Sequence, residues 1–257
     1  MNVVGVQLDT AWEDKEANHA KLAALLAADP PAPGTLVVLP EMWATGFSMN
    51  VAEVAETSAA ETETFLSMLA EQYQIGLLGG VVTTGADGLG RNEAVLFGTD
   101  GEEAARYTKM HPFSFGQETQ HYVRGSAITV FEWQGFSVAP FICYDLRFPE
   151  VFRHAARLGA EVFCVIANWP EARVDHWMTL LKARAIENQA YVVGINRCGD
   201  DPNLHYPGRS LVFGPRGEVL ADGGTGEGML SARLDRETLR AYRRDFPALD
   251  DIHPDYR

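Results

Sequence analysis

The stretch "FSVAPFICYDLRFPEVFRHAARLGAEVFCVIAN" (residues 136–168) decides the fold class. Its first eight residues form an apolar run typical of a buried strand. Pro149 suits the first turn of a helix that reaches about Leu158, and "EVFCVIAN" (161–168) returns as a second buried strand. A strand, a helix and a strand in about thirty residues make a βαβ unit, which places two parallel strands in one sheet. The stretch therefore predicts an α/β protein.

The same alternation of apolar strands and amphipathic helices extends toward both ends of the chain. Strands are predicted over residues 2–8, 35–40, 75–84, 93–99, 127–133, 190–197 and 228–234. Helices are predicted over 15–26 and 174–188, and a further helix, capped by Thr57 or Ser58, extends to Tyr73. Turns are predicted at 85–90, 134–135 and 215–217. This mixture of βαβ units and hairpins predicts a layered α/β sandwich with mixed sheets. No repeat or linker divides the chain, so a single domain over 1–257 is expected, with a C-terminal tail from about residue 236.

Composition excludes several classes of function. Acidic residues outnumber basic ones 35 to 21, giving a formal charge of −14, which would repel a nucleic acid or an anionic membrane. No signal peptide or membrane span is visible, so a cytoplasmic protein is expected. The three cysteines (Cys143, Cys164 and Cys198) cannot all pair within one chain, and cytosol would keep them as thiols. The seven histidines are scattered without metal-ligand spacing, so no metal site is expected.

Three chemically capable side chains stand where a predicted strand gives way to a loop. Glu41 follows "TLVVLP", Lys109 follows "EEAARYT", and Cys143 follows "FSVAPFI". A thiol with a free pKa near ~8.5 needs a base or a cation nearby in order to attack well at neutral pH. A glutamate can take the proton and a lysine can stabilise an oxyanion. These three side chains are therefore sufficient for acyl transfer if the fold brings them together.

The ordered segments "PEMWATGF" (40–47), "YTKMHPF" (107–113) and "ICYDLRFPE" (142–150) resemble the carbon–nitrogen hydrolase (nitrilase) superfamily. The resemblance implies a four-layer α-β-β-α sandwich, usually paired into a homodimer, and hydrolysis of a small amide that needs neither metal nor organic cofactor. It further implies the role of each site residue: Glu41 as general base, Lys109 as oxyanion-stabilising cation, Cys143 as nucleophile, Glu118 as a second active-site carboxylate, and the Tyr144 backbone N–H as part of the oxyanion hole.

Within the superfamily, "ANWPEARVDHWMTLLKARAIENQAYVVGINR" (167–197) is most similar to the omega-amidase branch, which hydrolyses the side-chain amide of 2-oxoglutaramate or 2-oxosuccinamate. Such substrates carry a carboxylate, for which Arg173 is the expected partner because a guanidinium binds a carboxylate bidentately. Arg147 is expected instead to be a structural ion-pair partner of Asp145 or of a glutamate. The aromatic residues expected to line the pocket are Trp43, Phe115 and Trp169.

Other interpretations remain open at this point. A neighbouring branch that acts on N-carbamoyl compounds, aliphatic amides or nitriles would use the same four catalytic residues. A catalytically silent family member that serves as a binding protein is a third possibility, which the intact Glu41–Lys109–Cys143 set disfavours. Cysteines are usually buried for packing, and this is the interpretation favoured for Cys164 and Cys198. Trp177, Leu180 and Leu181, at helical spacing, are expected in the core.

Overall fold

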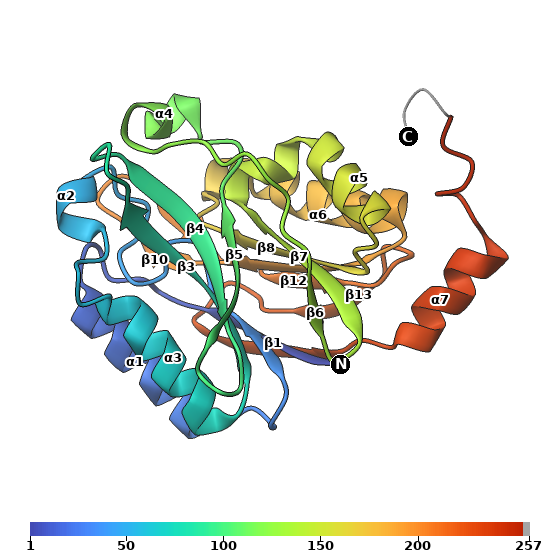
Figure 1. The fold of residues 1–257 in the computed structure, drawn as a ribbon, viewed down its shortest axis with the longest axis horizontal. Coiled ribbons are helices and arrows are strands. Elements are labelled where there is room, and N and C mark those ends of the chain that lie inside the picture. The colour runs from blue at the N-terminus through green and yellow to red at the C-terminus, as the bar shows by residue number, and fades with distance from the viewer. Residues whose placement is uncertain (254–257) are drawn as a thin grey trace.

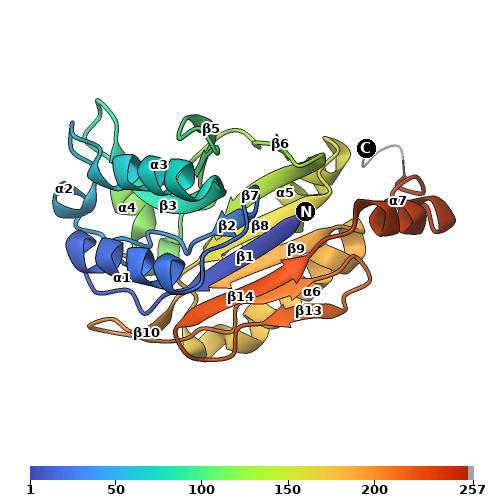
Figure 2. The same cartoon turned by 90° about the horizontal axis from the view of Figure 1, so that it is seen from below.

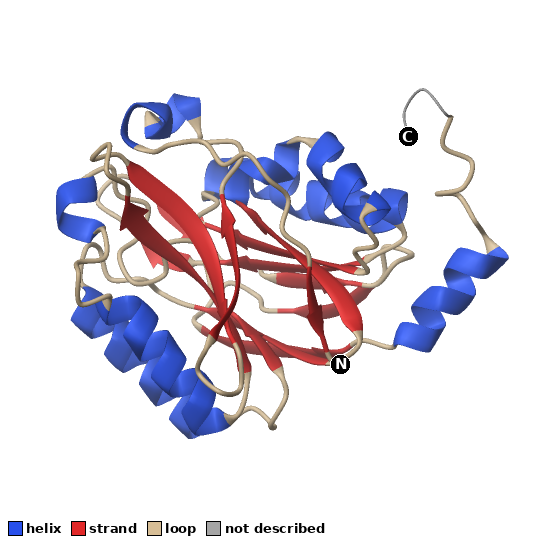
Figure 3. Cartoon of the chain, in the orientation of Figure 1, coloured by secondary structure: helices blue, strands red, loops and turns tan. Residues whose placement is uncertain are grey.

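The computed structural model describes residues 1–253, so the last four residues of the predicted tail, 254–257, lie outside the described part. Figure 3 shows the helices and strands. The strands are β1 Asn2–Gln7, β2 Leu36–Val38, β3 Gly76–Thr84, β4 Gly90–Phe97, β5 Glu103–Thr108, β6 Phe131–Trp133, β7 Phe136–Ile142, β8 Val162–Ala167, β9 Tyr191–Asn196, β10 Cys198–Asp200, β11 His205–Pro207, β12 Leu211–Phe213, β13 Val219–Asp222 and β14 Gly228–Arg233. The α-helices are α1 Lys15–Ala28, α2 Val51–Val54, α3 Glu61–Tyr73, α4 Glu118–His121, α5 Pro149–Arg157, α6 Val174–Asn188 and α7 Arg236–Asp245, with 3₁₀ turns η1 Ser114–Gly116, η2 Cys143–Arg147 and η3 Glu171–Arg173. Among the described residues, every helix is too short or too polar to span a bilayer.

Two six-stranded mixed sheets form the centre of the molecule, in the orders β14-β1-β2-β3-β4-β5 and β13-β12-β9-β8-β7-β6. Read from β5 in one sheet and from β13 in the other, both give the same series of pairings: two antiparallel, two parallel and one antiparallel. Helices α1 and α3 cover the first sheet, and α5 and α6 cover the second (Figures 1 and 2). The predicted four-layer α-β-β-α sandwich is thus confirmed.

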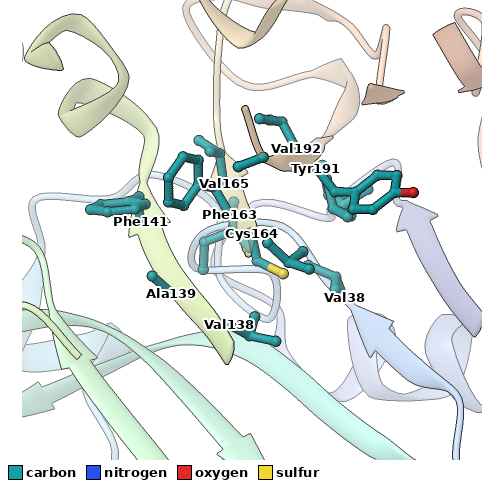
Figure 4. Close-up of a cluster of buried hydrophobic side chains, with 14 of the residues drawn as sticks. Val38, Val138, Ala139, Phe141, Phe163, Cys164, Val165, Tyr191 and Val192 are labelled. Carbon is teal, nitrogen blue, oxygen red and sulfur yellow. The ribbon is translucent and has the colours of Figure 1, made fainter. Parts of the chain in front are cut away.

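The main hydrophobic core lies between the sheets and beneath α5 and α6. Figure 4 shows part of it, with Cys164 packed beside Val38 and Val138, so this cysteine is a packing residue. At the centre of β1, a Cβ on Gly5 would lie 2.1 Å from the Ile195 side chain of β9. Glycine at this position therefore allows the two sheets to approach each other closely.

The predicted elements are largely confirmed, with two corrections. Strands β7 and β8 are parallel and joined by α5, as the βαβ unit requires, and a turn with positive φ at Gln134 and Gly135 connects β6 to β7. The predicted cap at Thr57 or Ser58 is wrong, because the Glu56 carboxylate accepts the Thr62 N–H at 2.7 Å instead. The short hairpin of β10 and β11 was not predicted.

The C-terminal helix α7 is held against the end of the second sheet by a buried carboxylate. Glu161, only 5% exposed, accepts a hydrogen bond from Arg236 Nε and another from Arg240 Nε, each at 3.1 Å. Leu239, on the same helix, is fully buried. The first part of the predicted tail is therefore an anchored helix, which extends from one end of the sandwich (Figure 1).

Candidate active site

A cavity of about 430 Å³ opens at the end of the sandwich where β2, β5, β7 and β8 give way to loops. Glu41 and Lys109 follow strands of the first sheet, whereas Cys143 and Asn168 follow strands of the second. Since the carboxyl ends of parallel strands carry the ligand-binding loops, this placement is the one expected for a site in an α/β protein. The site is built across the junction of the two sheets.

Lys109 is the centre of a buried charge cluster. Its Nζ lies 2.8 Å from Glu41 Oε1 and 2.9 Å from Glu118 Oε2, and all three side chains are at most 1% exposed. The Phe113 N–H also donates to Glu118 Oε2. The structure thus brings the predicted second carboxylate, Glu118, against the lysine, although it comes from the separate short helix α4.

Two asparagines that were not predicted as site residues hold the carboxylates in place. Asn92 Nδ2 donates to Glu41 Oε1 at 2.7 Å and to Glu118 Oε1 at 2.9 Å. The Asn168 backbone N–H donates to Glu41 Oε2 at 2.8 Å, and its side-chain amide donates to the Glu41 carbonyl at 2.7 Å. A polar residue inside the buried strand β4 was the one available signal for Asn92. Together with Lys109, these donors fix both oxygens of Glu41.

The charges of the cluster set its protonation. Burial alone would lower the pKa of Lys109, but Glu118 and Glu41 outweigh burial and hold that pKa above its ordinary value, so the lysine is cationic. Burial raises the pKa of Glu118; Lys109 opposes this and Glu41 adds to it. Burial and then the Glu41 charge raise the pKa of Cys143 well above its ordinary value, with Lys109 acting in the opposite direction. The resting cysteine is therefore a neutral thiol that needs a base.

Cys143 occupies a strained turn between β7 and the 3₁₀ turn η2. Its φ is +45°, a left-handed conformation that a non-glycine residue adopts at a cost. Its sulfur lies 3.8 Å from the Asn168 carbonyl oxygen and lines the cavity. The Tyr144 N–H belongs to the first turn of η2, where backbone amides have no partner within the helix. The Tyr144 N–H therefore has no hydrogen-bond partner within the helix and can serve as the expected oxyanion donor.

Gly80 on β3 permits the close approach of the turn that carries Glu41. A Cβ at this position would lie 2.4 Å from the Met42 nitrogen and 2.7 Å from the Glu41 Cα, both rigid backbone atoms. Gly80→Ala is therefore expected to destabilise the fold by about 1–3 kcal/mol and, by displacing Glu41, to lower kcat about 100-fold. Thermal unfolding and initial rates measure both effects. Gly226→Ala, with open space around its Cβ, is the matched control, and equal losses in the two variants would contradict the prediction.

Two arginines line the cavity and lie on aromatic rings. The Arg147 guanidinium is 4.9 Å from the ring centroid of Trp169, and that of Arg173 is 5.6 Å from the ring centroid of Phe113. Neither forms an ion pair with a carboxylate in the described part of the chain, despite the excess of acidic residues. The expectation that Arg147 pairs with Asp145 is wrong, because that carboxylate is occupied by other donors. Arg147 Nη2 lies 3.2 Å from His176 Nδ1, and a guanidinium has five N–H donors, so both arginines keep donors for an anion.

The aromatic wall differs from the expectation at one position. Trp169, whose Nε1 donates to the Arg173 carbonyl at 2.7 Å, and Phe115, which is 85% exposed, both line the cavity. Trp43 does not: it is fully buried between the first sheet and its helices, 6.2 Å from Phe65. The left-handed turn at Met42 (φ +42°) follows Glu41 directly, so simple strand alternation did not predict where the next side chains point.

Further wall residues were not individually predicted to line the cavity. These are Trp12, Phe47, Met49, Asp201, Asn203, Leu204 and Tyr206. The last four belong to the hairpin of β10 and β11 and its turn, which faces the cavity. In residues 1–253, no three His, Cys, Asp or Glu side chains gather closely enough to ligate a metal ion.

The comparison with known proteins decides the family. The model of the carbon–nitrogen hydrolase family matches residues 3–244. The chain belongs to the carbon–nitrogen hydrolase family. A member from Yersinia enterocolitica named omega-amidase YafV is 41% identical over 250 residues, covering 96% of this chain and 94% of that protein. A 2-oxoglutaramate amidase of Bacillus subtilis is 33% identical, covering 97% of this chain and 96% of that protein.

A solved structure supports the same assignment. A carbon–nitrogen hydrolase superfamily protein from Xanthomonas campestris, with an arsenic adduct in its active site, superimposes with a TM-score of 0.92. It is 32% identical, and the match covers 98% of this hydrolase and 97% of that chain. The four-layer architecture described above is therefore that of the nitrilase superfamily.

Proposed function

We propose that this hydrolase is an omega-amidase, which cleaves the side-chain amide of 2-oxoglutaramate or 2-oxosuccinamate and releases ammonia. The observation that carries the proposal is the buried Glu41–Lys109–Glu118 cluster beside Cys143, which lines a cavity together with two arginines that form no ion pair within the described residues. The names of the Yersinia and Bacillus relatives support the same substrate class.

The geometry supports an acylation step at Cys143. As the sulfur adds to the amide carbon, its proton passes to Glu41, which the raised pKa of the thiol makes necessary. The carbonyl oxygen becomes negative and is stabilised by the Lys109 ammonium and the Tyr144 N–H. Glu41 then gives the proton to the amide nitrogen, the C–N bond breaks, and ammonia leaves a thioester on Cys143.

Hydrolysis of the thioester reverses the same proton path. Glu41 takes a proton from water, the hydroxyl adds to the thioester carbon, and Lys109 again meets the negative oxygen. The carbon–sulfur bond breaks, the thiol regains its proton and the carboxylic acid leaves. Glu118 keeps Lys109 charged and oriented throughout, through contacts of 2.9 and 3.1 Å.

The two arginines account for a preference for carboxylate-bearing amides. A guanidinium in a partly desolvated pocket gains more from a carboxylate than from a neutral group. Arg173→Ala is expected to raise KM for 2-oxoglutaramate about 10- to 100-fold, and to change KM for a neutral aliphatic amide little. Steady-state ammonia release measures both constants. Arg244→Ala, an exposed arginine on α7, is the control, and equal effects on both substrates would remove Arg173 from the binding site.

A panel of substrates tests the assignment to this branch. Rates of product release from 2-oxoglutaramate, glutamine, an N-carbamoyl amino acid and a nitrile are compared under one condition. The highest kcat/KM is expected for 2-oxoglutaramate, whereas a clearly faster carbamoyl compound or nitrile would assign the protein to another branch. An unmodified Cys143 without turnover of any of the four would favour a binding protein. The proposal includes a homodimer, as the resemblance to the superfamily implies, and it places the enzyme in the cytoplasm.

A further inference from the structure

Asp145 is a fully buried carboxylate that the proposed reaction does not use. Its Oδ2 accepts the Tyr107 hydroxyl at 2.7 Å and the Ile142 N–H at 3.0 Å. Its Oδ1 accepts the His111 N–H at 3.0 Å and lies 2.8 Å from His111 Nδ1. Four contacts occupy both oxygens, so the carboxylate is fully satisfied without any cation from Arg147.

The donors to this carboxylate come from both catalytic loops. Tyr107 and His111 lie two residues before and two residues after Lys109, and Ile142 directly precedes Cys143. The carboxylate therefore links the end of β5 in the first sheet to the end of β7 in the second. It is also the third residue of η2, and by accepting the N–H before that turn it holds the turn's first residues in place.

We infer that Asp145 is the positioning residue that sets the distance between the Lys109 ammonium and the Cys143 thiol. The inference rests on the proposed function, in which both groups act on one carbonyl. An ionised carboxylate has only acceptors, whereas an amide of the same shape would turn an N–H toward some of these donors. Each oxygen accepts one backbone N–H that cannot rotate away, from Ile142 or from His111, so one of these two would lose its partner and the loop at Cys143 or at Lys109 would shift.

The experiment is Asp145→Asn, compared with the wild-type chain. We expect kcat for 2-oxoglutaramate to fall about 100-fold or more while KM changes less than about threefold, because binding groups stay in place and the reacting groups do not. A second readout is alkylation of Cys143 by iodoacetamide as a function of pH. Lys109 lowers the pKa of this thiol, so its displacement is expected to move the alkylation profile to higher pH.

Two further variants separate positioning from general destabilisation. Glu161→Gln alters a buried carboxylate that accepts Arg236 and Arg240 far from the cavity, and should lower the unfolding temperature without changing kcat. Tyr107→Phe removes one donor to Asp145 and the 3.3 Å acceptor of the Met110 N–H, and it is expected to fold even if Asp145→Asn does not. It should lower kcat about fivefold at constant KM, with Tyr191→Phe as its control.

The inference is overturned if Asp145→Asn and Tyr107→Phe both have the same kcat as their controls and the alkylation profile of Cys143 does not move. A rise in KM alone would overturn it as well. Failure of the proposed function is a different result, in which the wild-type chain itself does not hydrolyse 2-oxoglutaramate. The alkylation profile then still tests the position of Lys109 relative to Cys143, because it needs no substrate.

Discussion

Cys143→Ala is expected to abolish ammonia release from 2-oxoglutaramate, lowering kcat by about 10⁴-fold or more. The sulfur is the atom that bonds to the acyl carbon in the proposed mechanism, and no other described cysteine lies on the cavity wall. The fold should persist, since the hydrogen bond from the thiol to the Asn168 carbonyl is long, at 3.8 Å. The same unfolding temperature within a few degrees, together with lost turnover, is the expected result.

Mass spectrometry gives this prediction a direct readout. Brief incubation of the wild-type chain with substrate, followed by an acid quench, should add one acyl group to the peptide that contains Cys143. Cys164→Ala is the matched control: that residue is fully buried in the core, so its loss should cost stability and leave turnover intact. Residual wild-type activity in Cys143→Ala, or an acyl group on another residue, would refute the nucleophile assignment.

Lys109→Met is expected to reduce both activity and stability. Loss of an oxyanion donor lowers kcat about 10²- to 10³-fold. The variant also leaves Glu41 and Glu118 buried together without a cation, and breaking a buried ion pair in this way costs about 3–5 kcal/mol. Lys182→Met, an exposed lysine on α6, is the control and should change neither quantity. Chemical denaturation and initial rates measure the two effects.

The pH dependence of stability distinguishes the loss of this cation from a simple packing defect. The pKa of Glu118 is raised even in the wild-type chain, and removing Lys109 takes away the group that opposes this rise. A carboxyl whose folded pKa lies above its unfolded value binds protons more tightly in the folded state, so the free energy of unfolding increases as pH falls. Lys109→Met should therefore regain stability between neutral pH and about pH 5. An unchanged deficit over this range would argue for lost packing instead.

The sequence was sufficient to predict the groups whose position follows from strand ends. Lys109 and Cys143 stand directly after β5 and β7, and Glu41 stands three positions after the end of β2; the end of a strand in a sandwich of this kind has a fixed place. The sequence was not sufficient for contacts that depend on the path of the chain in space. Asn92 and Asn168 lie 51 and 127 residues from Glu41, and no local pattern connects such positions.

The errors at Trp43 and Arg147 both fall in turns next to a catalytic residue. Both follow a catalytic residue by a few positions, inside turns where Met42 and Cys143 have positive φ. Such turns break the alternation that assigns side chains to one face or the other. Trp43 therefore lies in the core instead of the cavity. Arg147 lies on Trp169 because other donors already occupy Asp145.

Because Glu41 and Lys109 follow strands of one sheet and Cys143 follows a strand of the other, the reaction is sensitive to any sliding of one sheet over its neighbour. A displacement of about 1 Å at this junction would separate base from nucleophile while leaving nearly all secondary structure intact. The rate of turnover is therefore a more sensitive probe of the alignment of the two sheets than circular dichroism. At low denaturant concentration, the enzyme would lose activity before it unfolds.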